Sequence, residues 1–183
     1  RRQRQMCIRD RIRFDFTAHE LVLLTTDGDV RRMALRPRSI ADFYDEYLGH
    51  LDALGVDVEL HGSPVELPEV TPFADDTAER PYDADAVASF WRVLVDAHRV
   101  FSRFRGEFRG KSSPVHFFWG AFDLAVTRFS GRPAPQHPGG IPNCPDHVMY
   151  EAYSDEVSSA GFWPGGAEEG VFYSYAYPHP EGY

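Results

Sequence analysis

Alternating apolar and polar residues near the start of the chain predict a three-stranded antiparallel meander. Residues 12–16 alternate, with apolar side chains at Ile12, Phe14 and Phe16, and 21–26 and 30–35 are further short stretches rich in apolar residues, with polar corners between the three. A period of two is typical of a strand with one buried face. The pair Asp27-Gly28 is a common hairpin turn, so the third stretch is expected to return along the second.

Two longer stretches carry apolar residues at helical spacing. The first covers 39–54, with Ser39 as its expected N-cap and Gly55 just past its end. The second covers 84–109 and follows Asp83, whose carboxylate can cap the first turn. The sequence therefore predicts two main helices.

The remaining segments predict short strands and two irregular stretches. The alternation at 56–60 predicts a fourth strand, and the proline-rich segments 64–81 and 131–145 predict long loops. Four aromatic stretches predict further strands, and these are residues 115–119, 122–129, 158–163 and 171–177. The expected fold class is α+β, with a mainly antiparallel sheet, built from the meander and the aromatic hairpins, covered by the two helices.

Length and composition fit one domain. The chain has 183 residues, of which 43% are hydrophobic, enough for a sizeable core. We expect a single domain over 12–183. The two cysteines, Cys7 and Cys144, form no disulfide framework and are interpreted as reduced thiols.

Residues 1–11 are interpreted as a tail outside the fold. The run from Met6 to Arg11 resembles the translated end of a transposon adapter used in sequencing libraries, and such tails are excluded from fold reasoning. A basic arm for nucleic acid is the alternative. Without the tail, which contains five arginines and one aspartate, the net charge falls from −9 to −13.

Charge and hydropathy exclude several partners. An acidic body repels the phosphate backbone, so we expect no nucleic-acid partner; only 99–111 is a candidate basic patch. No stretch approaches the roughly 18 apolar residues of a membrane span, and the start lacks the apolar segment of a secretory signal. We therefore expect a cytoplasmic protein with no membrane partner.

The densest candidate chemistry lies in an aromatic hairpin. A two-residue turn at Gly120-Ala121 places His116 opposite Ala125 and makes His116 and Asp123 diagonal neighbours on one face. Diagonal residues are roughly 7 Å apart at the backbone, within reach of a histidine–aspartate pair. Such a pair would orient a general base, and it is equally common as a structural contact.

Six further side chains complete the candidate site. Arg128 and Arg132 could clamp a carboxylate or phosphate, with solvated surface arginines as the alternative. Glu156 is a candidate catalytic carboxylate at the start of the next strand, although its neighbour Asp155 must point to the opposite face. Trp119, Ser158 and Trp163 are the other candidate ligand-binding residues.

Known catalytic and metal-binding motifs do not appear in the chain. There is no Gly-x-Ser-x-Gly elbow, His-Glu-x-x-His helix or phosphate loop. His137, Cys144 and His147 match no standard zinc spacing, so no metal site is expected. The sequence indicates neither a cofactor nor an oligomeric state.

Three segments, 113–132, 153–165 and 172–178, closely resemble the bacterial family designated domain of unknown function 5996. The resemblance extends from about Phe14 to Tyr183. It implies that relatives are longer at both ends, so this chain is expected to be a fragment. It also implies histidine in many relatives where this chain has Asp155, which weakens any essential role for that position.

Two classes of function stay open from the sequence. One is a domain that binds a small polar or anionic metabolite, and acts as an enzyme if His116 and Asp123 form a working pair. The other is a non-catalytic module for a ligand or a protein. A concave site around His116 would favour the first, and an exposed aromatic patch at Trp119 or Trp163 the second.

Overall fold

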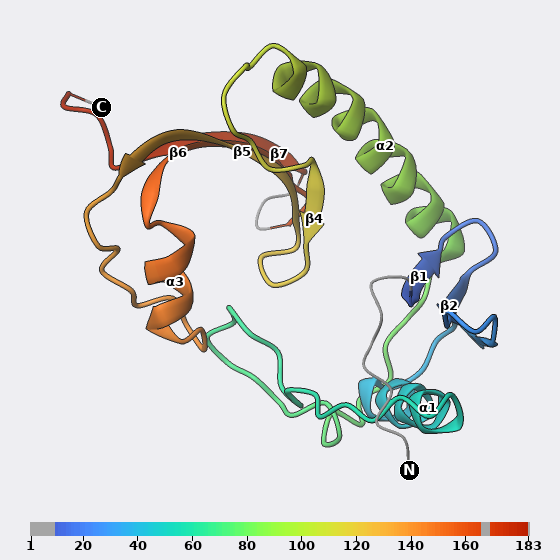
Figure 1. Cartoon of the computed structure of the whole chain (residues 1–183). Helices are drawn as coiled ribbons and strands as arrows, with labels where there is room; N and C mark the ends of the chain where they lie inside the picture. The colour runs from blue at the N-terminus through green and yellow to red at the C-terminus, as the bar shows by residue number, and fades with distance from the viewer. Residues whose placement is uncertain (1–9, 166–168, 183) are drawn as a thin grey trace. The chain divides into compact units, whose positions relative to one another are not determined.

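The fold is known from a computed structural model that describes residues 10–165 and 169–182. The described residues form helices and two antiparallel sheets, which confirms the α+β prediction (Figure 1). The meander and the aromatic hairpins form separate sheets, where a joint sheet was expected. The chain divides into two compact units, Arg1–Pro64 with Glu69–Trp91, and Val65–Pro68 with Arg92–Tyr183. The single-domain interpretation stays a prediction.

The sheet of the first unit is the predicted meander. Its strands are β1 (Arg11–Asp15), β2 (Glu20–Leu24) and β3 (Val30–Ala34), in the order β1-β2-β3. Gly28 has a φ of 92° in the turn between β2 and β3, a conformation that glycine adopts without strain. The buried core of this unit consists of Leu21, Leu23, Met33, Leu51 and Leu54.

Helix α1 (Ile40–Ala53) begins and ends at the predicted signals. The backbone N–H of Asp42 donates to Ser39 Oγ at 3.0 Å, which satisfies one free donor of the first turn. Gly55 follows the helix with a φ of 68°, and the N–H of Val56 donates back into the last turn. This pattern is a Schellman motif.

The strand predicted at 56–60 is wrong, because these residues form no regular secondary structure. The Schellman motif turns the chain, and Val56 and Leu60 then pack against the core of the meander. Their alternation therefore reflects packing on an existing core and not pairing with another strand.

The exclusion of residues 10 and 11 from the fold is also wrong. Arg11 begins β1 and pairs with Leu24, while Asp10 Oδ1 accepts hydrogen bonds from the backbone N and Oγ1 of Thr26 at 2.5 and 2.7 Å. Residues 1–9 lie outside the described residues.

The second unit contains a four-stranded antiparallel sheet. Its strands are β4 (His116–Phe118), β5 (Asp123–Pro133), β6 (Asp155–Trp163) and β7 (Val171–Tyr177), in the order β4-β5-β6-β7. The sheet curves strongly around α3 (Asp146–Ala152) (Figure 1).

The register of the aromatic hairpin agrees with the prediction. His116 pairs with Ala125 and Phe118 with Asp123, as a two-residue turn requires. Strand β5 is longer than expected and runs past Phe129 to Pro133 after a register shift.

Helix α2 (Ala84–Gly106) confirms the second predicted helix, three residues shorter than expected at its end. Asp83 Oδ1 accepts the N–H of Ala86 at 3.0 Å, as its capping role requires. In the second unit, Phe101 of α2 contacts Phe172 of β7 with ring centroids 5.9 Å apart. No helix in the described parts of the chain is long and apolar enough to cross a membrane.

Helix α3 has no counterpart among the predicted elements. It has seven residues, too few to show a helical period in the sequence, and Pro145 at its N-cap makes no side-chain capping hydrogen bond. It follows the irregular segment after β5, of which 134–145 agrees with the predicted loop.

Candidate functional site

All three tyrosines in the strands of the four-stranded sheet lie on one face of it, which we call the tyrosine face. Ala125 pairs with Gly161, and Gly161 with Tyr173, so the three residues share a face. The alternation along each strand extends this face to Asp123, Thr127, Ser159, Tyr175 and Tyr177.

Asp123 is a buried carboxylate on the tyrosine face. Its residue surface is only 7% exposed, and its Oδ2 atom accepts a hydrogen bond from the hydroxyl of Tyr173. Burial and this hydrogen bond raise the pKa of Tyr173, so the phenol stays protonated and acts as a donor. His116 is exposed and its ring packs on Phe118, with centroids 4.2 Å apart. The two residues of the proposed histidine–aspartate pair thus have different partners.

Gly161 makes room for the Tyr173 ring. A Cβ atom at position 161 would lie 2.3 Å from both Cζ and Oη of Tyr173, closer than any real Cβ contact. The ring can therefore lie across β6 and reach Asp123 only because residue 161 has no side chain.

A second tyrosine pair extends the polar network toward α3. The hydroxyls of Tyr153, at the C-cap of α3, and Tyr175 are 3.1 Å apart, and the rings of Tyr173 and Tyr175 stack at 6.1 Å. Burial, followed by the hydrogen bond to Tyr175, raises the pKa of Tyr153. The negative charges of Asp123 and Glu66 raise the pKa of Tyr153 further.

The tyrosine face ends in an open cavity of about 550 Å³ beside the β4–β5 turn, which we call the turn groove. Its lining consists of Glu66, Leu67, Gly120, Ala121, Phe122, Asp123, Trp163, Val171 and Tyr173. Trp163 Nε1 donates to the carbonyl of Ala121 at 3.0 Å, which holds the indole against the turn. The groove therefore combines two carboxylates with aromatic side chains.

The backbone around the turn groove is strained at two positions. Glu66 has a φ of 61° and Phe122 a φ of 59°, in the left-handed region that side chains other than glycine rarely adopt. The Glu66 carboxylate lies close against Gly120: a Cβ at position 120 would lie 2.3 Å from Glu66 Oε1, so the flexible Glu66 side chain would have to move. Such strain clusters at binding sites and active sites.

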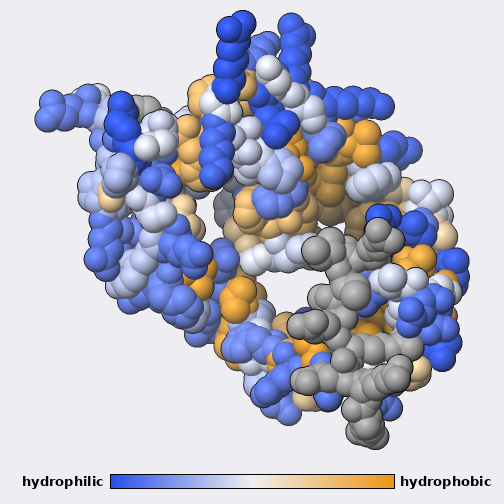
Figure 2. Space-filling model, viewed as in Figure 1, coloured by the Kyte–Doolittle hydropathy of each residue, from blue (hydrophilic) through white to orange (hydrophobic). Residues whose placement is uncertain are grey.

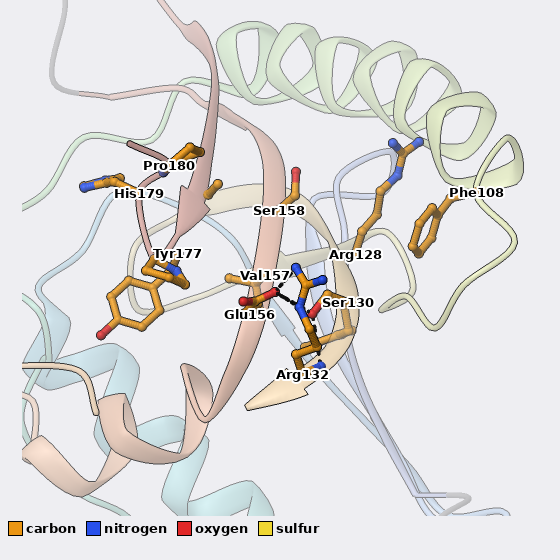
Figure 3. Close-up of a pocket in the computed structure, with 13 residues that line it drawn as sticks. Phe108, Arg128, Ser130, Arg132, Glu156, Val157, Ser158, Tyr177, His179 and Pro180 are labelled. Atoms are coloured by element: carbon orange, nitrogen blue, oxygen red, sulfur yellow. Dashed lines mark hydrogen bonds and ion pairs between the residues drawn. The ribbon is translucent and has the colours of Figure 1, made fainter. Parts of the chain in front are cut away.

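A second cavity, of about 530 Å³, lies near the far ends of β5, β6 and β7, and we call it the strand-end groove (Figure 3). Arg132 and Glu156 point toward one another there, with Nη2 and Oε2 2.6 Å apart, and Ser130 Oγ donates to the same carboxylate oxygen at 2.9 Å. The hydrogen bonds from Arg132 and Ser130 lower the pKa of Glu156. Arg132 and Glu156 thus neutralise each other.

Arg128 lines the strand-end groove but faces the end of α2. Its guanidinium lies 3.3 Å from the centroid of the Phe104 ring and donates to the Phe104 carbonyl, in the last turn of the helix. A cation at a helix C-terminus satisfies free carbonyls and interacts favourably with the helix dipole. Its Nε atom is buried without a hydrogen-bond partner in the described part of the chain.

His137, one of the residues considered for zinc, serves other contacts. His137 stacks on Tyr153 at 4.7 Å, and its Nδ1 accepts the N–H of Gly139 at 3.0 Å. Within 10–165 and 169–182, no group of three histidine, cysteine, aspartate or glutamate side chains could hold a metal ion.

Comparison with known proteins places the chain in a family. The sequence model of the family of unknown function DUF5996 matches residues 4–183. The chain belongs to this family. No curated protein matches it, and no solved structure matches it.

In this DUF5996 member, the predicted site residues divide between the two grooves. Asp123 and Trp163 line the turn groove, whereas Arg128, Arg132, Glu156 and Ser158 line the strand-end groove. Arg128, Glu156 and Ser158 lie on the face opposite to Asp123 and Trp163, because odd and even positions of β5 and β6 alternate, whereas Arg132 lies within the register shift of β5. His116 and Trp119 belong to neither lining, and Trp119 is 62% exposed.

Sequence reasoning missed Glu66, Gly161, Tyr153 and Tyr173. The alternation of tyrosines at 173, 175 and 177 was a readable signal, because it aligns three rings on one face of a strand. Glu66 gave no comparable signal, since the loop that carries it is 57 positions away from Asp123 in the sequence.

Proposed function

We propose that this protein is a small-molecule-binding domain and that a polar ligand occupies the turn groove. The observation that carries the proposal is the buried Asp123 carboxylate, which lines the groove and has Tyr173 as its only side-chain hydrogen-bond donor among the described residues. Burial of a charged carboxylate is costly unless further partners compensate it. A ligand is a natural source of such a partner.

The strained backbone on both sides of the groove supports the same site. Glu66 and Phe122 come from separate segments, and each retains a positive φ that costs free energy. The pockets that bind small molecules commonly combine apolar walls with a few polar groups that converge, as this groove does.

Binding fits the geometry better than acid–base catalysis. The raised pKa values of Tyr153 and Tyr173 keep both phenols protonated, which makes them poor bases. His116 packs on Phe118 and is not among the groove residues. An enzyme would therefore have to use Asp123 or Glu66 as its base.

The alternative is a protein-binding module that uses the tip of the aromatic hairpin. Trp119 is 62% exposed and Phe122 47%, and their rings contact at 6.4 Å. Exposed aromatic clusters are typical of protein interfaces. This alternative predicts a partner whose binding depends on Trp119.

A ligand-observed NMR screen tests the proposal. Amines, amino acids, monosaccharides and dicarboxylates are offered to the wild type and to the Glu66→Gln, Asp123→Asn, Glu156→Gln and Trp119→Ala variants. We expect one class to bind, with binding lost in the first two variants and retained in the last two. Binding that depends on Glu156 in place of Glu66 would move the site to the strand-end groove, and no binding from any class would reject the proposal.

A further inference from the structure

The turn groove carries negative charge without a protein cation. Its lining includes Glu66 and Asp123 but no lysine or arginine. In the described segments, neither carboxylate takes part in a salt bridge, whereas the carboxylate of Glu156 in the strand-end groove does. The charge in the turn groove is therefore not compensated by the surrounding side chains.

The side-chain donors in the groove are already engaged. Tyr173 donates its hydroxyl proton to Asp123, and Trp163 donates its N–H to the Ala121 carbonyl at 3.0 Å. The polar side-chain groups left for a ligand are carboxylate oxygens, which only accept hydrogen bonds when ionised. An anionic ligand would meet repulsion and no side-chain donor.

Aromatic side chains supply the rest of the lining. Phe122, Trp163 and Tyr173 border the two carboxylates. A ring face attracts a cation because its quadrupole is negative there, and the attraction grows when the site excludes water. Carboxylates beside aromatic rings are the combination that recognises ammonium groups.

We propose that the turn groove selects a small organic cation, a protonated or quaternary amine, as its ligand. This inference rests on the proposed function and narrows its ligand from polar molecules in general to cations. The negative net charge of −9 also favours the approach of a cation from solution.

A pair of isosteric probes separates charge from shape. Choline and 3,3-dimethylbutanol have the same outline, but a carbon atom replaces the ammonium nitrogen in the second. Titration of the full chain, followed by tryptophan fluorescence and isothermal calorimetry, gives both dissociation constants, with glucose as a neutral hydrogen-bonding probe. We expect choline to bind at least about tenfold more tightly than its isostere. Its affinity should fall as NaCl rises from about 20 to about 200 mM.

Variants with a matched charge change locate the effect. Glu66→Gln should weaken choline binding about tenfold and leave the weak binding of the isostere unchanged. Glu69→Gln removes the same charge from an exposed residue in the same loop that is not part of the lining, and should leave choline binding unaltered. Glu66→Gln is preferred over Asp123→Asn because Glu66 is only half-buried, so its replacement threatens the fold less.

The outcomes distinguish this inference from the proposed function. Equal affinity for choline and the isostere, or binding of glucose but not choline, would overturn the cation preference and leave a polar-ligand site in place. If Glu66→Gln and Glu69→Gln weakened choline binding equally, the binding would depend on the general surface charge and not on the turn groove. This result would also overturn the cation preference of the groove. Failure of all three probes, together with a negative ligand screen, would overturn both proposals.

Discussion

At the scale of single residues, Gly161 sets the position of the Tyr173 ring, whose hydroxyl donates a hydrogen bond to Asp123. Positions 161 and 173 pair directly across β6 and β7, so any side chain at 161 competes with the ring for one volume. The buried carboxylate depends on this arrangement for its side-chain hydrogen bond.

Gly161→Ala is expected to destabilise the protein by about 1–3 kcal/mol, because the new methyl group forces the Tyr173 ring away from Asp123. Urea unfolding measures the change. Gly49→Ala is the matched control: Gly49 lies exposed in α1, nothing is within 4 Å of its added Cβ, and alanine should stabilise a helix by roughly 0.5–1 kcal/mol. A Gly161→Ala variant as stable as the wild type would contradict the proposed role of the glycine.

Arg38 gives a second prediction at this scale. Its side chain is 9% exposed, and its Nη2 atom donates to Glu46 Oε2 at 2.5 Å, which lowers the pKa of Glu46. Glu46→Gln leaves a buried guanidinium without its counter-charge. We expect the free energy of unfolding to fall by about 1–2 kcal/mol at pH 7. This is less than for a fully buried ion pair, because the Glu46 side chain is 36% exposed.

The pH dependence of that loss has a defined sign. Since the folded-state pKa of Glu46 is lowered, its contribution is complete above the usual value of 4.5 and disappears as the pH falls through the folded-state pKa. Urea unfolding at several pH values should therefore show wild type and variant converging in acid. Glu20→Gln removes the partner of Arg32, whose side chain is 54% exposed where that of Arg38 is 9% exposed; it is the control and should change stability by less than about 0.5 kcal/mol.

At the scale of elements, β7 and the end of α3 place two protonated phenols in a partly buried network. Tyr173 and Tyr153 both have raised pKa values, with burial as the largest cause. In the unfolded chain, tyrosine loses its proton near pH 10. The stability that the buried phenols contribute is therefore complete below about pH 10 and is lost as the pH rises beyond it.

We predict that the melting temperature falls steeply above about pH 10, and less steeply in Tyr173→Phe, which has no proton to lose at that position. Tyr173→Phe should also be less stable at pH 7, by about 1–3 kcal/mol, because Asp123 loses its donor. Melting curves followed by circular dichroism between pH 7 and pH 11 measure both effects. Tyr150→Phe, an exposed position in α3, should follow the wild type; parallel curves for all three proteins would contradict the prediction.

At the scale of the whole molecule, acidic charge dominates, and hydrophilic side chains cover most of the face in Figure 2. The candidate basic patch at 99–111 is partly neutralised. Arg99 lies 2.9 Å from Asp96, and Arg103 lies 3.7 Å from Glu107. Two of the five cations in this patch are thus paired with carboxylates, and the negative net charge of the chain opposes the approach of phosphate groups.

We predict no measurable binding of a labelled 20-nucleotide DNA or RNA at about 150 mM salt, as read by fluorescence anisotropy. Charge reversal at Asp96 and Glu107 to lysine should introduce weak binding at low salt, since it frees the arginines and adds two cations. Binding by the unmodified protein at 150 mM salt would contradict the expectation that its negative charge repels nucleic acid.

The sequence alone determined the local features of this protein. Alternation, capping residues and turn residues identified the meander, both long helices and the hairpin register, because each of these depends on interactions between residues close in the chain. The same reasoning failed for 56–60 and α3. Alternation at 56–60 arises from packing against a core formed by other elements, and a seven-residue helix is too short to show a period.

Only the tertiary structure decided the candidate site. The register placed Asp123 on the correct face, but its actual partner, Tyr173, lies two strands away in the sheet, and Glu66 comes from a distant loop. Residues that were predicted to share one site divide between two grooves, and in the strand-end groove Arg132 and Glu156 neutralise each other. The sequence shows which residues carry carboxylates and hydrogen-bond donors. Which carboxylate pairs with which donor depends on the packing of segments that are distant in the chain, because only that packing brings them within contact distance.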